Sequence, residues 1–282
     1  MADQPRQHHV ILHLTYGSAE QTIIRVAAEM AHLLGLDLRG VYLEQEALPG
    51  LATLPFIREF RLATREWRKL NAVEIANEQR EAASEARRLV DEAAAALGVA
   101  RLFEVVRGDP ALLIAAGSQT GDILVVALPR LPVERLVHAT AHLLEAAHQS
   151  AAAVMLVPPT LARRQGPVAV VVCEKSDPAL LTAAHIAVAA GEDLLLLVSG
   201  PPALTREAVA QARSAGLAPQ RISTRSVASM TPEDILHALG ASDERLVVLV
   251  RGICGGDDAA VSSHIAVSRG VPILVVEPTT DA

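Results

Sequence analysis

The sequence is poor in aromatic side chains, cysteine and positive charge. Only 2% of its 282 residues are Phe, Trp or Tyr, so it has few rings on which nucleic-acid bases could stack. Its formal net charge of −7 also argues against binding to a phosphate backbone, which requires a surplus of Lys and Arg. The only cysteines, Cys173 and Cys254, are too few for a disulfide framework. We therefore expect no nucleic-acid partner and no disulfide scaffold.

Long apolar runs and a secretory pattern are also missing. No stretch reaches the roughly 18 uninterrupted apolar residues that a membrane-spanning helix needs, and the amino terminus lacks a basic region followed by an apolar one. We therefore expect a cytoplasmic protein without a transmembrane segment.

Short apolar runs alternate with Ala-rich stretches of helical spacing. The runs are rich in Val, Leu and Ile without polar alternation, which is typical of strands buried on both faces. They occur at Val10–Leu14, Leu38–Leu43, Leu102–Val106, Ile123–Ala127 and Ala153–Val157, and again at Val168–Val172, Leu194–Val198, Arg221–Ser226, Leu246–Val250 and Ile273–Val276. The stretches of helical spacing include Gln21–Leu34, Val73–Leu97, Val133–Gln149 and Leu204–Ala215. Strand alternating with helix predicts an α/β protein with parallel sheets covered on both sides.

The two sets of strands form an internal repeat. In each half the last two strands have the same apolar pattern, and the preceding helix begins alike, at Gly108-Asp109-Pro110 and at Thr231-Pro232-Glu233. Proline suits the first helical turn, and Asp109 and Thr231 can accept hydrogen bonds from its free amides. We expect two doubly wound, Rossmann-like domains in tandem at 1–160 and 161–282, joined around Pro158–Pro167, with a larger connection at 44–70 in the first.

These features resemble the universal stress protein family in its tandem form. The resemblance covers nearly all of the chain except 44–70, and it depends on the strand–helix order, the helix start at Gly108-x-Pro110-x-x-x-Ile114 and the closing strand of each half. It implies a five-stranded parallel sheet in the order 3-2-1-4-5 in each domain, with the two domains pairing through their last strands. It also implies that some members bind ATP and that dimers form, here a homodimer or higher homo-oligomer with intramolecular pairing of the domains.

In ATP-binding members of the family an Asp ends the first strand, and a glycine-rich loop after the fourth strand surrounds the phosphates. In the first half Tyr16 stands at the Asp position, and Ala127, Arg130 and Thr140-Ala141 stand where glycines and a hydroxyl residue are needed. Backbone amides approach phosphate closely only where no Cβ intervenes. The first half is therefore not expected to bind ATP.

In the second half Glu174 replaces the Asp, and the loop contains Gly252, Gly255 and Gly256. The family's Gly-Ser position is Ala259-Ala260, and Asp257 and Asp258 would add negative charge beside a triphosphate. Two interpretations remain open: an ordinary strand-to-helix turn, or a surviving anion site that would bind a nucleotide through Glu174 and these glycines. We expect no cofactor by the family's usual mode, with ATP as the alternative.

No other group of residues indicates catalysis or a metal. His138 and His142 have helical i, i+4 spacing without a third ligand, and His13 is expected to be a hydrogen-bonded core residue. Ser18 and Ser176 are expected to cap helices. Cys254 lies in the glycine-rich turn, where acidic neighbours oppose activation of a thiol. We therefore expect no enzyme, although a metabolic enzyme on this fold stays a further class.

The connection at 44–70 departs from the family pattern. Ile57, Phe60, Thr64 and Trp67 recur at helical spacing and predict a basic amphipathic helix. It is either a lid, with Phe60 and Trp67 packed over the empty nucleotide cleft, or a docking surface at 54–70 for a protein partner, a second copy of the chain or anionic lipid. The residues expected to contact a partner are Phe56, Phe60, Arg61, Arg65 and Trp67.

The function these observations favour is non-catalytic, regulatory or scaffolding binding of the stress-response type. The alternative is an adenine-nucleotide-binding stress protein, with slow hydrolysis of ATP, that uses the cleft of the second half.

Overall fold

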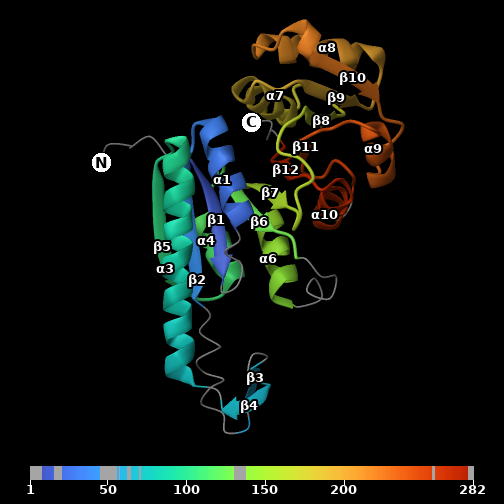
Figure 1. The fold of residues 1–282 in the computed structure, drawn as a ribbon. Coiled ribbons are helices and arrows are strands. Elements are labelled where there is room, and N and C mark those ends of the chain that lie inside the picture. The colour runs from blue at the N-terminus through green and yellow to red at the C-terminus, as the bar shows by residue number, and fades with distance from the viewer. Residues whose placement is uncertain are drawn as a thin grey trace.

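A computed structural model describes residues 8–15, 21–44, 56, 58–61, 65–69, 71–129, 138–255 and 258–278. They form an α/β protein in which one large sheet is covered by helices on both faces (Figure 1). This confirms the predicted fold class. None of the helices in these ranges combines the length and apolar character that crossing a bilayer requires.

The main sheet has ten strands in the order β10-β9-β8-β11-β12-β7-β6-β1-β2-β5. These strands are β1 (His9–Thr15), β2 (Asp37–Glu44), β5 (Arg101–Arg107), β6 (Ile123–Ala127), β7 (Ala153–Val157), β8 (Val168–Val172), β9 (Leu194–Val198), β10 (Ile222–Ser226), β11 (Leu246–Val250) and β12 (Ile273–Val276). Counted within each half, the order is third, second, first, fourth and fifth. The two five-stranded units together form one continuous sheet of ten strands.

The two halves join through their last strands. β7 and β12 are antiparallel, with Leu156 opposite Ile273 and Val154 opposite Val275, whereas neighbours within each half are parallel. The pairing that the resemblance implies is therefore made inside one chain. The domain boundary at residue 160 stays a prediction.

Helices cover the two faces of the sheet in separate layers. One layer contains α1 (Gln21–Leu34), α3 (Ala72–Leu97), α7 (Pro178–Ala190) and α8 (Pro202–Ser214), and the other contains α4 (Pro110–Gly117), α6 (His138–Gln149), α9 (Pro232–Leu239) and α10 (Asp258–Arg269). Successive strand residues alternate between the layers, since Val10 and Leu12 pack with the first and Ile11 with the second. Asp109 and Thr231 accept hydrogen bonds from the amides of Leu112 and Asp234, as predicted for helix caps.

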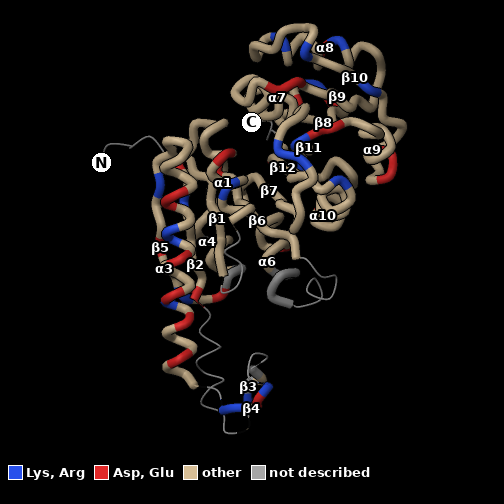
Figure 2. Tube along the Cα trace, in the orientation of Figure 1, with Lys and Arg blue, Asp and Glu red and all other residues tan. Residues whose placement is uncertain are grey.

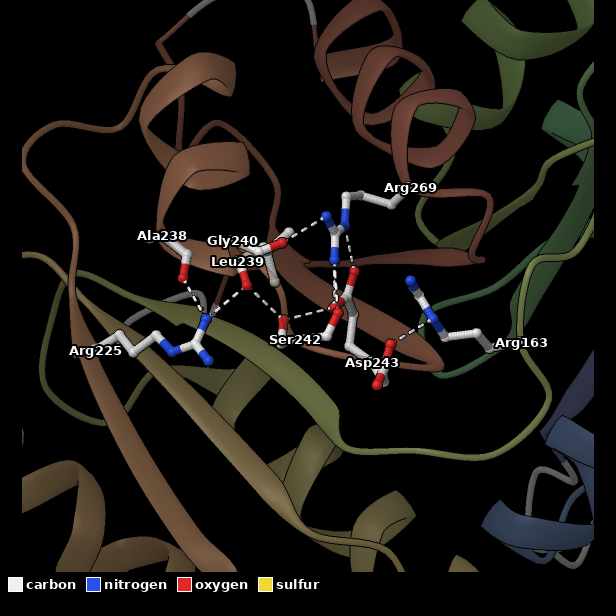
Figure 3. A network of polar contacts seen from close by, with 9 residues as sticks. Arg163, Arg225, Ala238, Leu239, Gly240, Ser242, Asp243 and Arg269 are labelled. Carbon is white, nitrogen blue, oxygen red and sulfur yellow. Dashed lines mark hydrogen bonds and ion pairs between the residues drawn. The ribbon is translucent and has the colours of Figure 1, made fainter.

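A fully buried carboxylate fixes the start of β11. Glu244 is 0% exposed, and Arg269 donates to its Oε1 and Oε2 at 2.6 and 2.9 Å from the end of α10 (Figure 3). Arg269 also donates to the carbonyl oxygens of Gly240 and Ser242, while the Ser242 hydroxyl donates to Glu244 at 2.6 Å. The hydrogen bond to Glu244 raises the pKa of Arg269. The network joins the carboxyl ends of α9 and α10 to the start of β11.

The connection at 44–70 contains a β-hairpin, so the predicted amphipathic helix is wrong. β3 (Arg58–Arg61) and β4 (Glu66–Lys69) are antiparallel, and Phe60 lies opposite Trp67 with ring centroids 5.2 Å apart. The hairpin lies away from the ten-stranded sheet, beyond the amino-terminal end of α3 (Figure 1). A seven-residue separation fits one helical stripe, but it also fits a cross-strand pair around a tight turn.

Candidate functional site

The predicted cleft lies at the carboxyl edge of the second half of the sheet. β8 is flanked there by β9 and β11, so the chain crosses to opposite sides of β8, which is where doubly wound proteins bind ligands. Glu174 is exposed in the turn after β8, and Gly252 and Gly255 lie in the turn after β11. The structure therefore brings these three predicted residues to one edge, while Gly256 lies outside the described residues.

The Gly252 and Gly255 amides of the turn after β11 have acceptors within the chain. The Gly252 amide donates to Asp258 Oδ2 at 2.7 Å, and the Gly255 amide donates to the Gly252 carbonyl oxygen at 3.0 Å. Both glycines have left-handed backbones, with φ values of 81° and 63°. A phosphate bound here would have to displace a carboxylate from the Gly252 amide, so the turn resembles an anion site whose anion is already supplied by Asp258.

Asp177 is a buried carboxylate at the same edge, and the sequence reasoning missed it. It is 1% exposed, its Oδ1 accepts from the Ala179 amide at 2.9 Å at the start of α7, and its Oδ2 has no hydrogen-bond partner within the described ranges. Burial raises its pKa to about 6, and the charge of Glu174 adds to the rise. The Asp-Pro pair before a helix was the available signal. The cap predicted at Ser176 is wrong, because Asp177 holds that position.

The two thiols near this edge are not activated. Burial raises the pKa of Cys254, and the carboxylate of Asp258 adds to the rise. Burial also raises the pKa of Cys173, with further contributions from Asp177 and Glu174. A reactive cysteine requires a lowered pKa. These raised pKa values favour two inert thiols over a nucleophile.

The cations at the edge are already paired. Arg251 donates to the carbonyl oxygens of Ser150 and Ala152 at 2.7 and 2.9 Å and forms an ion pair with Glu277 at 2.5 Å. It thereby holds the end of β11 against the turn between α6 and β7 of the first half. Lys175 is exposed and pairs with Glu207 at 2.8 Å. Neither cation is placed to balance a triphosphate.

Comparison with solved structures finds proteins that superpose over nearly the whole chain. A universal stress protein from Archaeoglobus fulgidus DSM 4304 superposes with a TM-score of 0.64 over 96% of this chain and 97% of that chain, at 15% identity. The chain has the universal stress protein fold. A putative universal stress protein from Pseudomonas aeruginosa UCBPP-PA14 gives a TM-score of 0.54 over 96% of this chain and 94% of that one, at 15% identity.

A functionally unknown protein from Pseudomonas aeruginosa PAO1 gives a TM-score of 0.55 at 14% identity, over 96% of this chain and 93% of that chain. The likeness extends over both halves of this chain and nearly all of each solved structure. Neither a family model nor a curated protein matches the sequence.

In the first half of this universal stress protein fold the corresponding cleft is only partly described. Tyr16, Ser18 and Arg130 lie outside the described residues, and Ala127 ends β6. His13 in β1 is largely buried, and burial lowers its pKa to about 4, with Arg39 contributing, so it is neutral at pH 7. Its burial agrees with the prediction, but its Nδ1 has no hydrogen-bond partner among the described residues.

No metal site emerges from the parts of the chain that the structure describes, where no three His, Cys, Asp or Glu residues gather. His138 and His142 lie on α6, as predicted, and their side chains are outside the description.

The predicted contact residues whose side chains the structure describes are exposed to solvent. Phe56, Phe60 and Trp67 are 76%, 43% and 65% exposed, so the lid hypothesis, which requires Phe60 and Trp67 to be buried, is wrong. Arg61 lies in β3, and Arg65 is exposed at the turn with a φ of 55°. Basic residues colour much of both hairpin strands in Figure 2. An exposed aromatic pair beside arginines is typical of a contact surface.

Proposed function

We propose that this chain is a non-catalytic regulatory or scaffolding protein of the stress-response type that does not bind ATP in the family's usual mode. The universal stress protein fold over both halves supports the class. The observation that carries the proposal is the hydrogen bond from the Gly252 amide to Asp258 Oδ2. This hydrogen bond occupies an amide that a bound phosphate would need, and it places the negative charge of Asp258 where the phosphate would lie.

The charge of the cleft supports the same conclusion. Four carboxylates follow the ends of β8, β11 and β12: burial and the charge of Glu174 raise the pKa of Asp177, and burial and the charge of Asp258 raise the pKa of Glu277. The neighbouring Arg251 is committed to Glu277 and to two carbonyl oxygens. At short range, repulsion from several carboxylates opposes binding of a triphosphate. The thiols with raised pKa and the absence of a paired acid and base in the described cleft support a binding role over catalysis.

Isothermal titration calorimetry with ATP and Mg²⁺ tests the proposal. We expect no binding heat from the wild type at micromolar to low-millimolar ATP. Asp258→Ala frees the Gly252 amide and removes one charge, so this variant should show measurable binding. Glu174→Gln is the matched control, because it removes a charge from the cleft without freeing an amide. Micromolar binding by the wild type that is lost in Gly255→Ala would favour the nucleotide-binding alternative.

We further propose that the hairpin segment 54–70 docks on the acidic surface of a second copy of the chain. Five basic and two acidic residues lie within 54–70, so this segment has a net charge of +3. Because the whole chain has a net charge of −7, the rest of the chain has a net charge of −10. Six acidic and three basic residues lie along α3, which gives this helix a net negative charge (Figure 2). An electropositive aromatic patch and an electronegative remainder favour association between copies. A homodimer or higher homo-oligomer follows from this proposal.

Light scattering after size exclusion tests the docking surface. The wild type should have at least twice the mass of one chain, and the double variant Phe60→Ser/Trp67→Ser should have the mass of one chain. Val267→Ser is a matched control, since it removes an exposed apolar side chain from α10, away from both the hairpin and α3. A double variant with the wild-type mass would exclude the hairpin as the contact. Blue-shifted Trp67 emission that depends on protein concentration would support it.

A further inference from the structure

A cavity of about 730 Å³ lies where the two halves meet, away from the predicted nucleotide cleft. α1 and α7 face each other across the β7–β12 junction (Figure 1), and the cavity extends between them to α3 and the linker around Leu161–Gln165. Its volume is in the range of small-molecule sites, which are frequent at junctions between domains. Residues from both halves line it, so a ligand there would contact both.

The walls of this junction cavity are largely apolar. Ile24 and Leu33 come from α1, Leu89 from α3, Ile186 from α7, and Met155 from β7. Leu246, at the start of β11, adds an apolar side chain from the second half. Such walls favour the aliphatic or aromatic body of a ligand, because burying it removes apolar surface from water.

Arginines give one part of the cavity a positive character. Arg163 forms an ion pair with Asp243 through Nε at 3.1 Å, but its buried Nη1 has no hydrogen-bond partner among the residues described (Figure 3). Asp243 is an exposed carboxylate, so this pair is open to exchange with a ligand anion. Arg25 and Arg164 also line the cavity, and no ion pair joins either to another residue of the described ranges.

The acidic residues at the cavity already have cationic partners. Arg245 pairs with Glu29 of α1 and with Glu192 at 3.7 Å, and Glu92 pairs with Arg88. These pairs leave Arg25, Arg163 and Arg164 as the donors available to an incoming anion. Guanidinium groups with open donors favour a carboxylate, which accepts from them in pairs.

We propose that the junction cavity binds a small amphipathic carboxylate, with its apolar body between α1, α3 and α7 and its anionic end at Arg163 and Arg164. This is a site for a different class of ligand from the nucleotide cleft. Because the ligand contacts both halves, it should stabilise their arrangement and raise the melting temperature of the whole chain.

Titration of the full chain with decanoate tests the proposal, using calorimetry and thermal unfolding. Decanoate should bind and raise the melting temperature. Decanol, which has the body without the charge, should bind at least tenfold more weakly, and acetate, which has the charge without the body, should not bind. Equal binding of decanol and decanoate would overturn the anionic end, and no binding of decanoate at millimolar concentration would overturn the site.

Two pairs of variants locate the binding. Ala189→Trp places an indole at an exposed position that lines the cavity and should abolish binding, whereas Val188→Trp, exposed on the same helix but outside the lining, should not. Arg163→Gln should weaken decanoate binding about tenfold or more. Arg206→Gln, an exposed arginine of α8 outside the cavity, should leave it unchanged. Equal effects within either pair would place binding elsewhere and overturn the proposal.

Discussion

Removing Arg269 tests how the buried carboxylate of Glu244 is held. Glu244 is 0% exposed, and Arg269 supplies two charge-assisted hydrogen bonds to it and two more to the carbonyl oxygens of Gly240 and Ser242. Arg269→Met leaves a buried charge without its cation, which costs about 3–5 kcal/mol of unfolding free energy. We expect this loss in urea denaturation followed by far-ultraviolet circular dichroism.

A double variant and two neighbouring arginines make the test specific. Glu244→Leu/Arg269→Met removes both charges, so it should lie within about 2 kcal/mol of wild type. Arg225 donates to the Ala238 and Leu239 carbonyl oxygens at the end of α9 at 2.8 and 2.5 Å, and Arg225→Met should cost about 1–2 kcal/mol. Arg163→Met, which loses an ion pair to an exposed carboxylate, should cost at most about 1 kcal/mol.

The outcome that would refute this reasoning is a change in rank. If Arg269→Met costs no more than Arg163→Met, burial of Glu244 is not what makes the pair important. The same conclusion follows if the double variant is no more stable than Arg269→Met, because then the loss comes from packing and not from the stranded charge.

Three further predictions concern the carboxyl edge and the first half. Burial raises the pKa of Asp177 from 3.8 to about 6, so the native state binds the proton more tightly, and stability should fall as pH rises from about 4 to 6. Asp177→Asn keeps the cap, should flatten this slope and should add about 1–3 kcal/mol at pH 7.5, measured by urea denaturation; an unchanged slope would contradict it. Cys254 should react with iodoacetamide at pH 7.5 more slowly than free cysteine, and faster in Asp258→Asn; equal rates in all three would contradict it. Gly40→Ala should cost about 1–3 kcal/mol in thermal unfolding, because its Cβ would lie 2.7 Å from Cδ2 of Phe103; a neutral effect would mean that the ring moves freely.

The ten-stranded sheet was largely readable from the sequence because buried parallel strands have a direct signature. Runs such as Val168–Val172 and Leu246–Val250 are apolar on both faces, and all five residues of each are buried in the structure. The internal repeat divided the strands into two sets of five, and the order of strands within each half came from the family resemblance. That the two halves share one sheet depended on the family resemblance, since no local pattern reports which strands meet across 100 residues.

The hairpin was mispredicted because its spacing is ambiguous. Phe60 and Trp67 fit a helical stripe as well as a cross-strand pair. The charges offered the missing signal, because the register places Glu59 opposite Arg68 and Arg61 opposite Glu66. Opposite charges facing each other across a turn favour a hairpin, whereas in a helix these pairs would be nine and five residues apart and on different faces.

The candidate sites were harder to predict than the fold. Gly252 and Gly255 were found because glycine spacing is visible in a sequence, but the carboxylate that occupies the Gly252 amide was known only as a nearby charge. Burial of Asp177 depends on the packing of α7 against β8, which sequence spacing does not show. The junction cavity was missed altogether, because its walls come from segments that the repeat analysis assigned to different domains.

The antiparallel pairing of β7 with β12 determines which sites can contact both halves of the chain. Strand direction reverses at this join, so the carboxyl edges of the two halves lie on opposite sides of the sheet. A ligand in one nucleotide-type cleft therefore cannot contact the other. α1 and α7, in contrast, lie in the same layer and meet over the join, where Arg245 of the second half pairs with Glu29 of the first. Within the described chain the junction cavity contacts both halves directly, which makes it the place where a small molecule would change the stability of both at once.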